Sequence, residues 1–139
     1  MLTRLNETEA TNLLADQRIG RLACITEAGP YVVPIGYYFV DGFAYCHSLP
    51  GLKIDALRKD PRACLQVDAI ESELRWKSVL AFGTYEEVKP KERSEIINQL
   101  LQRFPMLTPV ESALAVDAGP LPVIVFRIRI DRITGLAEE

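Results

Sequence analysis

The chain has 139 residues, of which 48% are hydrophobic and 25% are charged, and its formal net charge is −3. These values are typical of one globular domain that forms a core without disulfides or metal. The negative charge argues against nucleic-acid binding, and no apolar run approaches the ~20 residues of a membrane span. The N-terminal stretch lacks the apolar block of a signal peptide, so we expect one cytoplasmic domain over residues 1–139.

The cysteines and the single histidine restrict the possible metal and redox chemistry. Cys24, Cys46 and Cys64 are an odd number, and each lies in an apolar, strand-like run. This pattern predicts buried free thiols in a reducing compartment. Because His47 is the single histidine and no C-x-x-C pair occurs, we expect no metal site.

In chain order, the first third of the sequence predicts one helix and three strands. A capping box at Asn6 to Glu9 begins a helix that ends near Gln17. The strands that follow are expected at Ile19–Thr26, Tyr31–Val40 and Phe43–His47, with a turn at 27–30 and an Asp41-Gly42 hairpin. Pro34 and Gly36 are unusual within a strand, so the second strand is expected to be an edge, to contain a bulge or to lie against a ligand.

The next stretch, Tyr45–Pro61, predicts the end of a strand, a tight turn at Pro50-Gly51 and a short helix that Pro61 terminates. Free backbone N–H groups and the helix dipole make such a helix N-terminus a natural anion site. Ser48 can add a hydroxyl donor there, and Gly51 allows a ligand to approach the backbone closely.

Lys53 is the informative residue of this stretch. It falls in the first helical turn, where the dipole disfavours a cation. It therefore needs a negative partner, which the sequence leaves open as Asp55, Asp60 or a bound phosphate.

The second half of the sequence predicts three more strands and one more helix. The strands are expected at Ala63–Ala69, Trp76–Val88 and Pro122–Ile133, and residues 70–75 form either a polar loop or a ragged continuation of a strand. Pro90 begins a helix that ends at Pro105 and carries an apolar stripe formed by Ile96, Ile97, Leu100, Leu101 and Phe104. Residues 106–121 are expected to be irregular, with one helical turn at Glu111–Ala115.

The last strand alternates clearly between apolar and charged residues. The residues expected to face inward are Ile124, Phe126, Ile128 and Ile130, whereas Arg127, Arg129 and Asp131 are expected to face solvent. Gly83 in the preceding strand suggests a bend of the kind that barrels need. The whole pattern predicts a mainly β (α+β) fold, a six-stranded antiparallel barrel of Greek-key character with short peripheral helices.

Three ordered segments resemble the pyridoxamine 5'-phosphate oxidase-like superfamily of FMN-binding split β-barrels, most closely its nitroimidazole-resistance-type members. They are GRLACITEAGPYVVPIGYYF, YCHSLPGLKIDALRKDPRACLQVD and WKSVLAFGTYEEV, and they cover Gly20 to Val88. The resemblance implies a homodimer with FMN at the subunit interface and a small-molecule substrate, without nucleic-acid or membrane partners.

The resemblance also implies which residues contact the cofactor. The ring edge would lie along Val33, Pro34 and Ile35. The ring and ribityl chain would pass Tyr45, Cys46, His47 and Ser48, and the phosphate would bind at Gly51 and Lys53. Trp76, Lys77 and Ser78 would approach from the fifth strand.

Two departures from the family pattern change what is expected. Pyridoxamine 5'-phosphate oxidases have two adjacent basic residues at the phosphate, whereas Leu52 precedes Lys53 here. Their substrate-binding Trp and Arg segment near the C-terminus is missing as well, so oxidation of vitamin B6 is not expected. Related split barrels bind haem or a deazaflavin, which are the alternative cofactors.

The predicted function is an FMN-dependent oxidoreductase that passes electrons or hydride from NAD(P)H to a small molecule such as a nitroaromatic. His47 is the candidate catalytic residue, as a proton donor or a substrate contact. It can equally be a strand-end histidine bonded to the backbone, or an axial haem ligand. The alternative functions are a non-catalytic flavin or haem carrier or redox sensor, and a cofactor-free barrel that acts through its dimer surface.

Overall fold

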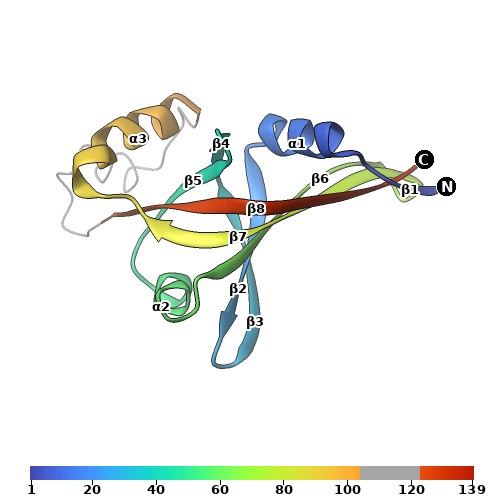
Figure 1. Ribbon diagram of the computed structural model, residues 1–139. Coiled ribbons are helices and arrows are strands. Elements are labelled where there is room, and N and C mark those ends of the chain that lie inside the picture. Colours follow the sequence, from blue (N-terminus) through green and yellow to red (C-terminus); the bar gives the residue numbers. More distant parts are fainter. Residues whose placement is uncertain (104–122) are drawn as a thin grey trace.

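The computed structural model describes residues 1–103 and 123–139, which form one antiparallel sheet and three helices (Figure 1). The helices are α1 (Glu7–Asp16), α2 (Leu52–Lys59) and α3 (Pro90–Arg103). The strands are β1 (Leu2–Arg4), β2 (Ile19–Thr26), β3 (Gly29–Gly36), β4 (Tyr38–Val40), β5 (Phe43–Ser48), β6 (Arg62–Ser72), β7 (Arg75–Glu87) and β8 (Ile124–Glu138). The predicted β-dominated barrel with peripheral helices is confirmed. The predicted number of six strands is wrong, because the described sheet has eight.

One additional strand arises because the predicted strand Tyr31–Val40 is interrupted at Tyr37. The backbone N–H of Tyr37 donates to the carbonyl of Arg18 at 2.9 Å, outside the β3 and β4 ladders. The Tyr37 ring is fully buried, and its hydroxyl donates to the carbonyl of Leu14 in α1 at 2.5 Å. This residue therefore ties the end of β3 to the first helix.

The change Tyr37→Phe is expected to lower the free energy of unfolding by about 1–2 kcal/mol, because the buried carbonyl of Leu14 loses its donor. Denaturant unfolding followed by circular dichroism measures this loss. Tyr31→Phe is the control, since the hydroxyl of Tyr31 has no partner among the described residues and should change stability little. Equal effects of the two changes would contradict the role of the buried bond.

The other differences from the predicted strands lie near the chain ends and at one hairpin. β1 consists of three exposed residues that pair with the end of β8. Because all three are exposed, the strand lacks the alternation of buried and exposed residues by which a strand is predicted from sequence. β8 itself continues to Glu138, beyond the predicted end at Ile133. Of the two possibilities for residues 70–75, the ragged strand is found: β6 runs to Ser72 and its pairing with β7 shifts register there.

The order of strands in the sheet is β3-β2-β6-β7-β8-β5-β4, and β1 pairs with β8. The neighbours β2–β6 and β8–β5 are not consecutive in the chain, which gives the sheet its Greek-key character. In Figure 1, α1 and α3 lie above β8, whereas α2 lies below it, beside the β2–β3 hairpin. Both termini lie at the far end of the β6–β7–β8 arm.

The core lies on the inner face of the sheet and contains mainly aliphatic side chains. Its largest fully buried members are Tyr37, Phe126, Leu14, Leu22, Ile54, Leu57, Leu65 and Ile128. The expected inward positions of Phe126 and Ile128 are thus confirmed, and Ile124 and Ile130 are partly buried against the same core. Val125 is buried too, on the other face, because α3 packs Ile97 against it. No helix in the described part of the chain is long and apolar enough to cross a membrane.

Sequence features also fix the helix ends. In the predicted capping box, Asn6 Oδ1 accepts the backbone N–H of Glu9 at 2.8 Å, and the Glu9 carboxylate accepts the N–H of Asn6 at 3.4 Å. In α3, Ile97 and Leu100 of the predicted stripe are buried. Phe104, the helical turn expected at residues 111–115 and the predicted strand start at 122 lie outside the described residues.

Candidate functional site

The N-terminus of α2 has an unusually open surrounding. Gly51 is the N-cap residue, and no side chain accepts a hydrogen bond from the first helical turn. A Cβ atom at Gly51 would meet no atom of the described residues within 4 Å. The described residues therefore provide no side-chain cap for the first turn of α2 and leave space at its N-cap, a combination that suits an anion.

Lys53 differs from the other cations of α2, Arg58 and Lys59, in having no acidic partner among the described residues. Arg58 pairs with Glu87 at 2.5 Å and Lys59 pairs with Glu27 at 3.2 Å. Lys53, half-buried in the first turn of α2, forms no ion pair with any carboxylate of the described residues.

The two intrachain partners that the sequence left open for Lys53 are not used. Asp60 binds Arg62 at 2.6 Å, and hydrogen bonds from Arg62 lower the pKa of its carboxyl to about 2. Asp55 forms no ion pair within the described part of the chain. Among the described residues Lys53 therefore pairs with neither aspartate, and a solvated lysine and a bound phosphate are the two alternatives that stay open.

The charge of Lys53 influences the pKa values of two buried thiols. Burial raises the pKa values of Cys24 on β2 and Cys46 on β5, and the charge of Lys53 offsets only part of this effect. Both thiols therefore stay protonated at neutral pH. The helix α2 packs against β2, and Cys46 is buried in the core, so it offers no accessible nucleophile.

The predicted cofactor segment of β5 is divided between the two faces of the sheet. Ala44 and Cys46 are buried, whereas Tyr45 and His47 alternate with them and are only partly buried. His47 pairs with Val125 of β8 in the register. The hydroxyl of Ser48 donates to the carbonyl of Leu49 at 2.8 Å. Tyr45 and His47 therefore share one face of β5, opposite the buried side chains of Ala44 and Cys46.

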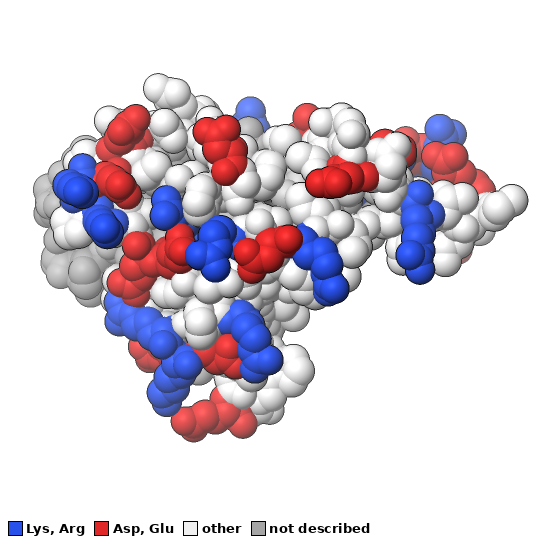
Figure 2. Space-filling model, viewed as in Figure 1, with Lys and Arg blue, Asp and Glu red and all other residues white. Residues whose placement is uncertain are grey.

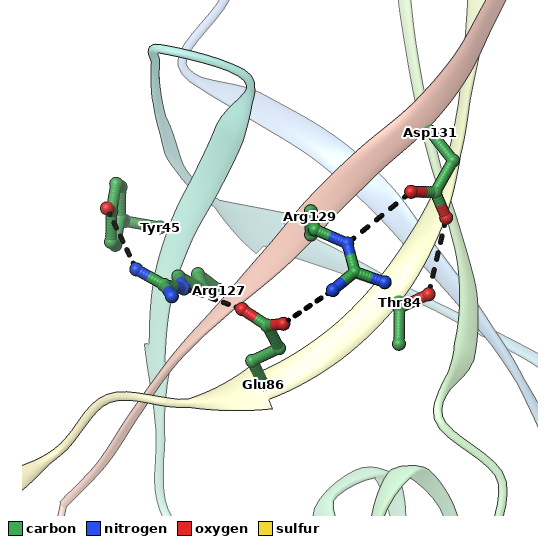
Figure 3. A network of polar contacts seen from close by, with 6 residues as sticks. All are labelled: Tyr45, Thr84, Glu86, Arg127, Arg129 and Asp131. Atoms are coloured by element: carbon green, nitrogen blue, oxygen red, sulfur yellow. Dashed lines mark hydrogen bonds and ion pairs between the residues drawn. The ribbon is translucent and has the colours of Figure 1, made fainter.

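Arg127 is a candidate that sequence reasoning placed on a solvated face. Its guanidinium lies 4.2 Å from the centroid of the Phe43 ring and donates to Glu86 at 2.9 Å and to the Tyr45 hydroxyl at 3.5 Å. Figure 3 shows that Glu86 joins it to Arg129, which in turn contacts Asp131. The network orients Tyr45. It forms because Tyr45 pairs with Arg127 in the register of β5 against β8, which the sequence alone does not show.

The segment Val33 to Ile35 lies in β3, at one end of the strand order. Pro34 is exposed and Ile35 is buried, while Val33 is intermediate. The sequence left three explanations for Pro34: an edge strand, a bulge or a nearby ligand. The structure shows the first, because β3 is an edge strand, where a proline is tolerated although it has no backbone N–H to donate.

Trp76, Lys77 and Ser78 lie far from α2 within one chain. They are at the start of β7, six to eight positions before Thr84, which pairs with Arg62 just after α2. At ~3.3 Å per residue these separations are roughly 20–26 Å. Trp76 and Lys77 line a separate hollow of about 250 Å³ at the far end of the arm.

A polar chain links Ser78 to β2 across the outer face of the sheet. Gln66 donates to the Ser78 hydroxyl at 3.1 Å and to Asp68 at 2.9 Å, and Asp68 pairs with Arg21 at 3.1 Å. Asp68 thus belongs to a bonded network and is not only solvated charge. Elsewhere, as Figure 2 shows for one face, acidic and basic side chains are interspersed.

Comparisons with known proteins agree on one family. The family profile described as pyridoxamine 5'-phosphate oxidase matches residues 6–137. An uncharacterized protein of Rhizobium meliloti (strain 1021) is 33% identical over 143 residues, covering 96% of this chain and 93% of that protein. The crystal structure of a FAD-binding protein from Mesorhizobium loti has a TM-score of 0.82 at 32% identity, covering 100% of this chain and 99% of that one. A FAD and haem binding protein from Mycobacterium smegmatis has the same fold, with a TM-score of 0.74 at 19% identity over 98% of this chain and 73% of that one.

Proposed function

This chain belongs to the pyridoxamine 5'-phosphate oxidase family, and on that premise we propose that it binds a flavin nucleotide at the N-terminus of α2. The observation that carries the proposal is Lys53, a half-buried cation without a carboxylate partner in the described residues. It lies in the first turn of a helix whose N–H groups no side chain caps. A phosphate there would satisfy the lysine and the backbone donors together.

The residues at this position fit a flavin phosphate. The Lys53 ammonium and the first-turn N–H groups would hold its oxygens, and Gly51 leaves the space that the phosphate needs. A bound flavin would supply hydride and single-electron transfer, which no side chain of the chain provides. FMN and FAD share this phosphate, so FMN, which the sequence resemblance implied, stays a prediction. The Mesorhizobium relative, named as FAD-binding, makes FAD an equal candidate.

We further propose that two copies of the chain assemble around the cofactor. Trp76, Lys77 and Ser78 are roughly 20–26 Å from the α2 region when measured along β7, so one chain does not bring all the expected contacts together. A homodimer in which the partner copy presents the start of β7 would complete the site. Size-exclusion chromatography with light scattering measures this assembly.

The proposed activity is oxidation of NAD(P)H with transfer of electrons to a small molecule such as a nitroaromatic. A non-catalytic flavin or haem carrier is the second candidate, and the protonated, buried state of Cys46 favours it, because this thiol adds no reactive group at the site. His47 is the side chain that would separate the two functions. His47→Gln should lower turnover at saturating flavin in the first case, and flavin affinity is measured separately because His47 is also an expected cofactor contact.

The first experiment is an absorption spectrum of the purified protein, followed by reconstitution with FMN, FAD and haemin. We expect flavin absorption bands and one flavin per chain. Turnover with NADH or NADPH and an electron-poor aromatic acceptor would then establish the oxidoreductase. A Soret band would point to haem and to His47 as its ligand, and the absence of any bound cofactor would contradict the proposal.

A further inference from the structure

A chain of hydrogen bonds on the outer face of the sheet links Arg21 on β2 to Ser78 on β7. Gln66 Nε2 lies 2.9 Å from Asp68 Oδ2 and 3.1 Å from Ser78 Oγ. Arg21 Nη1 lies 3.1 Å from the same oxygen of Asp68. In the register of the sheet, Arg21 pairs with Gln66 and Asp68 pairs with Ser78. The pairing of β2, β6 and β7 therefore holds the four side chains together.

The carboxylate of Asp68 sets the direction of these hydrogen bonds. An ionised carboxylate only accepts hydrogen bonds, so the Gln66 amide must turn its NH2 group toward Asp68. In the opposite orientation, the amide oxygen would lie against the carboxylate, and the two would repel each other. The same NH2 group reaches Ser78, so the Ser78 oxygen accepts this bond. The hydroxyl hydrogen of Ser78 is therefore left to bind another acceptor.

That hydroxyl hydrogen has no acceptor among the described residues. Large apolar side chains surround it on the outer face. Leu136, the register partner of Ser78 on β8, is 41% exposed, and Leu80, two positions further along β7, is 37% exposed. When a molecule covers such a surface, a hydroxyl group without an acceptor costs free energy. The face thus suits a ligand that places an acceptor oxygen at Ser78.

We propose that Ser78 donates this hydrogen bond to an oxygen atom of the flavin held by the partner copy. Gln66, Asp68 and Arg21 are then positioning residues that act only through Ser78. Gln66 orients the Ser78 hydroxyl group. Asp68 keeps the Gln66 amide from turning round, and Arg21 holds Asp68 in place. The inference rests on the proposed flavin function and on the dimer that brings the start of β7 to the α2 region.

Titrations with FMN and with FAD test the inference in two single variants and their combination. Ser78→Ala removes the donor and should weaken flavin binding by about 3- to 10-fold. Gln66→Glu should cause a similar loss, because the new carboxylate accepts the Ser78 hydrogen and withdraws it from the flavin. In the double variant the loss should be no greater than in Ser78→Ala alone, because Gln66 acts only through Ser78.

Two further variants keep the test decisive if a second carboxylate beside Asp68 disturbs the sheet. In Gln66→Leu the Ser78 hydrogen stays available, so flavin affinity should fall by less than about threefold. Gln102→Glu adds the same charge at an exposed position of α3 and should leave the affinity unchanged. Light scattering shows whether each variant assembles as the wild type does.

Several results would overturn the inference and leave the flavin function standing. They are an unchanged affinity in either single variant, losses that add in the double variant, and a loss in Gln66→Leu as large as in Gln66→Glu. A monomeric wild type that binds flavin would also overturn it, because Ser78 would then lie about 20 Å from the α2 region. If the wild type binds neither flavin, the flavin function itself fails and the inference fails with it.

Discussion

Replacing Lys53 with alanine is expected to weaken flavin binding by roughly 10- to 100-fold. A hydrogen bond to a charged group contributes about 1.5–3 kcal/mol, and each ~1.4 kcal/mol changes the dissociation constant tenfold. Lys53 is suited to this role because it forms no ion pair in the described chain, so its charge is not already neutralised. Titration of the apoprotein with FMN, followed by flavin fluorescence, measures the change.

Lys59→Ala is the matched control for this experiment. It removes the same type of charge from the same helix, but Lys59 pairs with Glu27 at the surface, where such pairs contribute ~0–1 kcal/mol. FMN affinity should therefore stay within about threefold of the wild type. Unchanged FMN affinity in Lys53→Ala would sink the phosphate position, whereas equal losses in both variants would indicate only a general effect of net charge.

Much of the region around α2 follows from the sequence because its signals are local. Pro50-Gly51 marks the turn, Pro61 ends the segment, and the dipole argument singles out Lys53 within a single helical turn. The structure bears out the helix and the position of Lys53, with α2 spanning Leu52–Lys59. The identity of the bound anion and the roles of the predicted contact residues stay predictions.

What the sequence missed depends on contacts between distant residues. Tyr37 leaves the strand ladder because its backbone N–H donates to the carbonyl of Arg18 and its hydroxyl donates to the carbonyl of Leu14. The apolar pattern of Tyr31–Val40 indicates neither of these hydrogen bonds. Arg127 reaches Tyr45 across 82 residues of sequence, so its half-buried position follows from register alone. A hollow between the β2–β3 turn and α2, lined by Ile25 and Leu52 among others, likewise forms only because these two elements pack side by side.

The sequence anticipated a bend at Gly83, and the structure shows why this position has to be glycine. The register of β7 against β8 shifts between Phe82 and Gly83. A Cβ atom at Gly83 would lie 2.2 Å from the carbonyl oxygen of Arg129 and 2.8 Å from a methyl carbon of Ile128. The carbonyl belongs to the backbone of the neighbouring strand, so it cannot move away without separating β7 from β8.

Gly83→Ala is therefore expected to lower the free energy of unfolding by at least about 3 kcal/mol, at the upper end of overpacking effects. Urea unfolding midpoints at constant slope measure this loss. Gly51→Ala is the control: its Cβ meets no atom within 4 Å and its φ of 167° is ordinary extended backbone, so stability should change by less than ~0.5 kcal/mol. A loss below ~1 kcal/mol in Gly83→Ala would mean that β8 yields at this point and that the close approach of the two strands is not a fixed feature of the barrel.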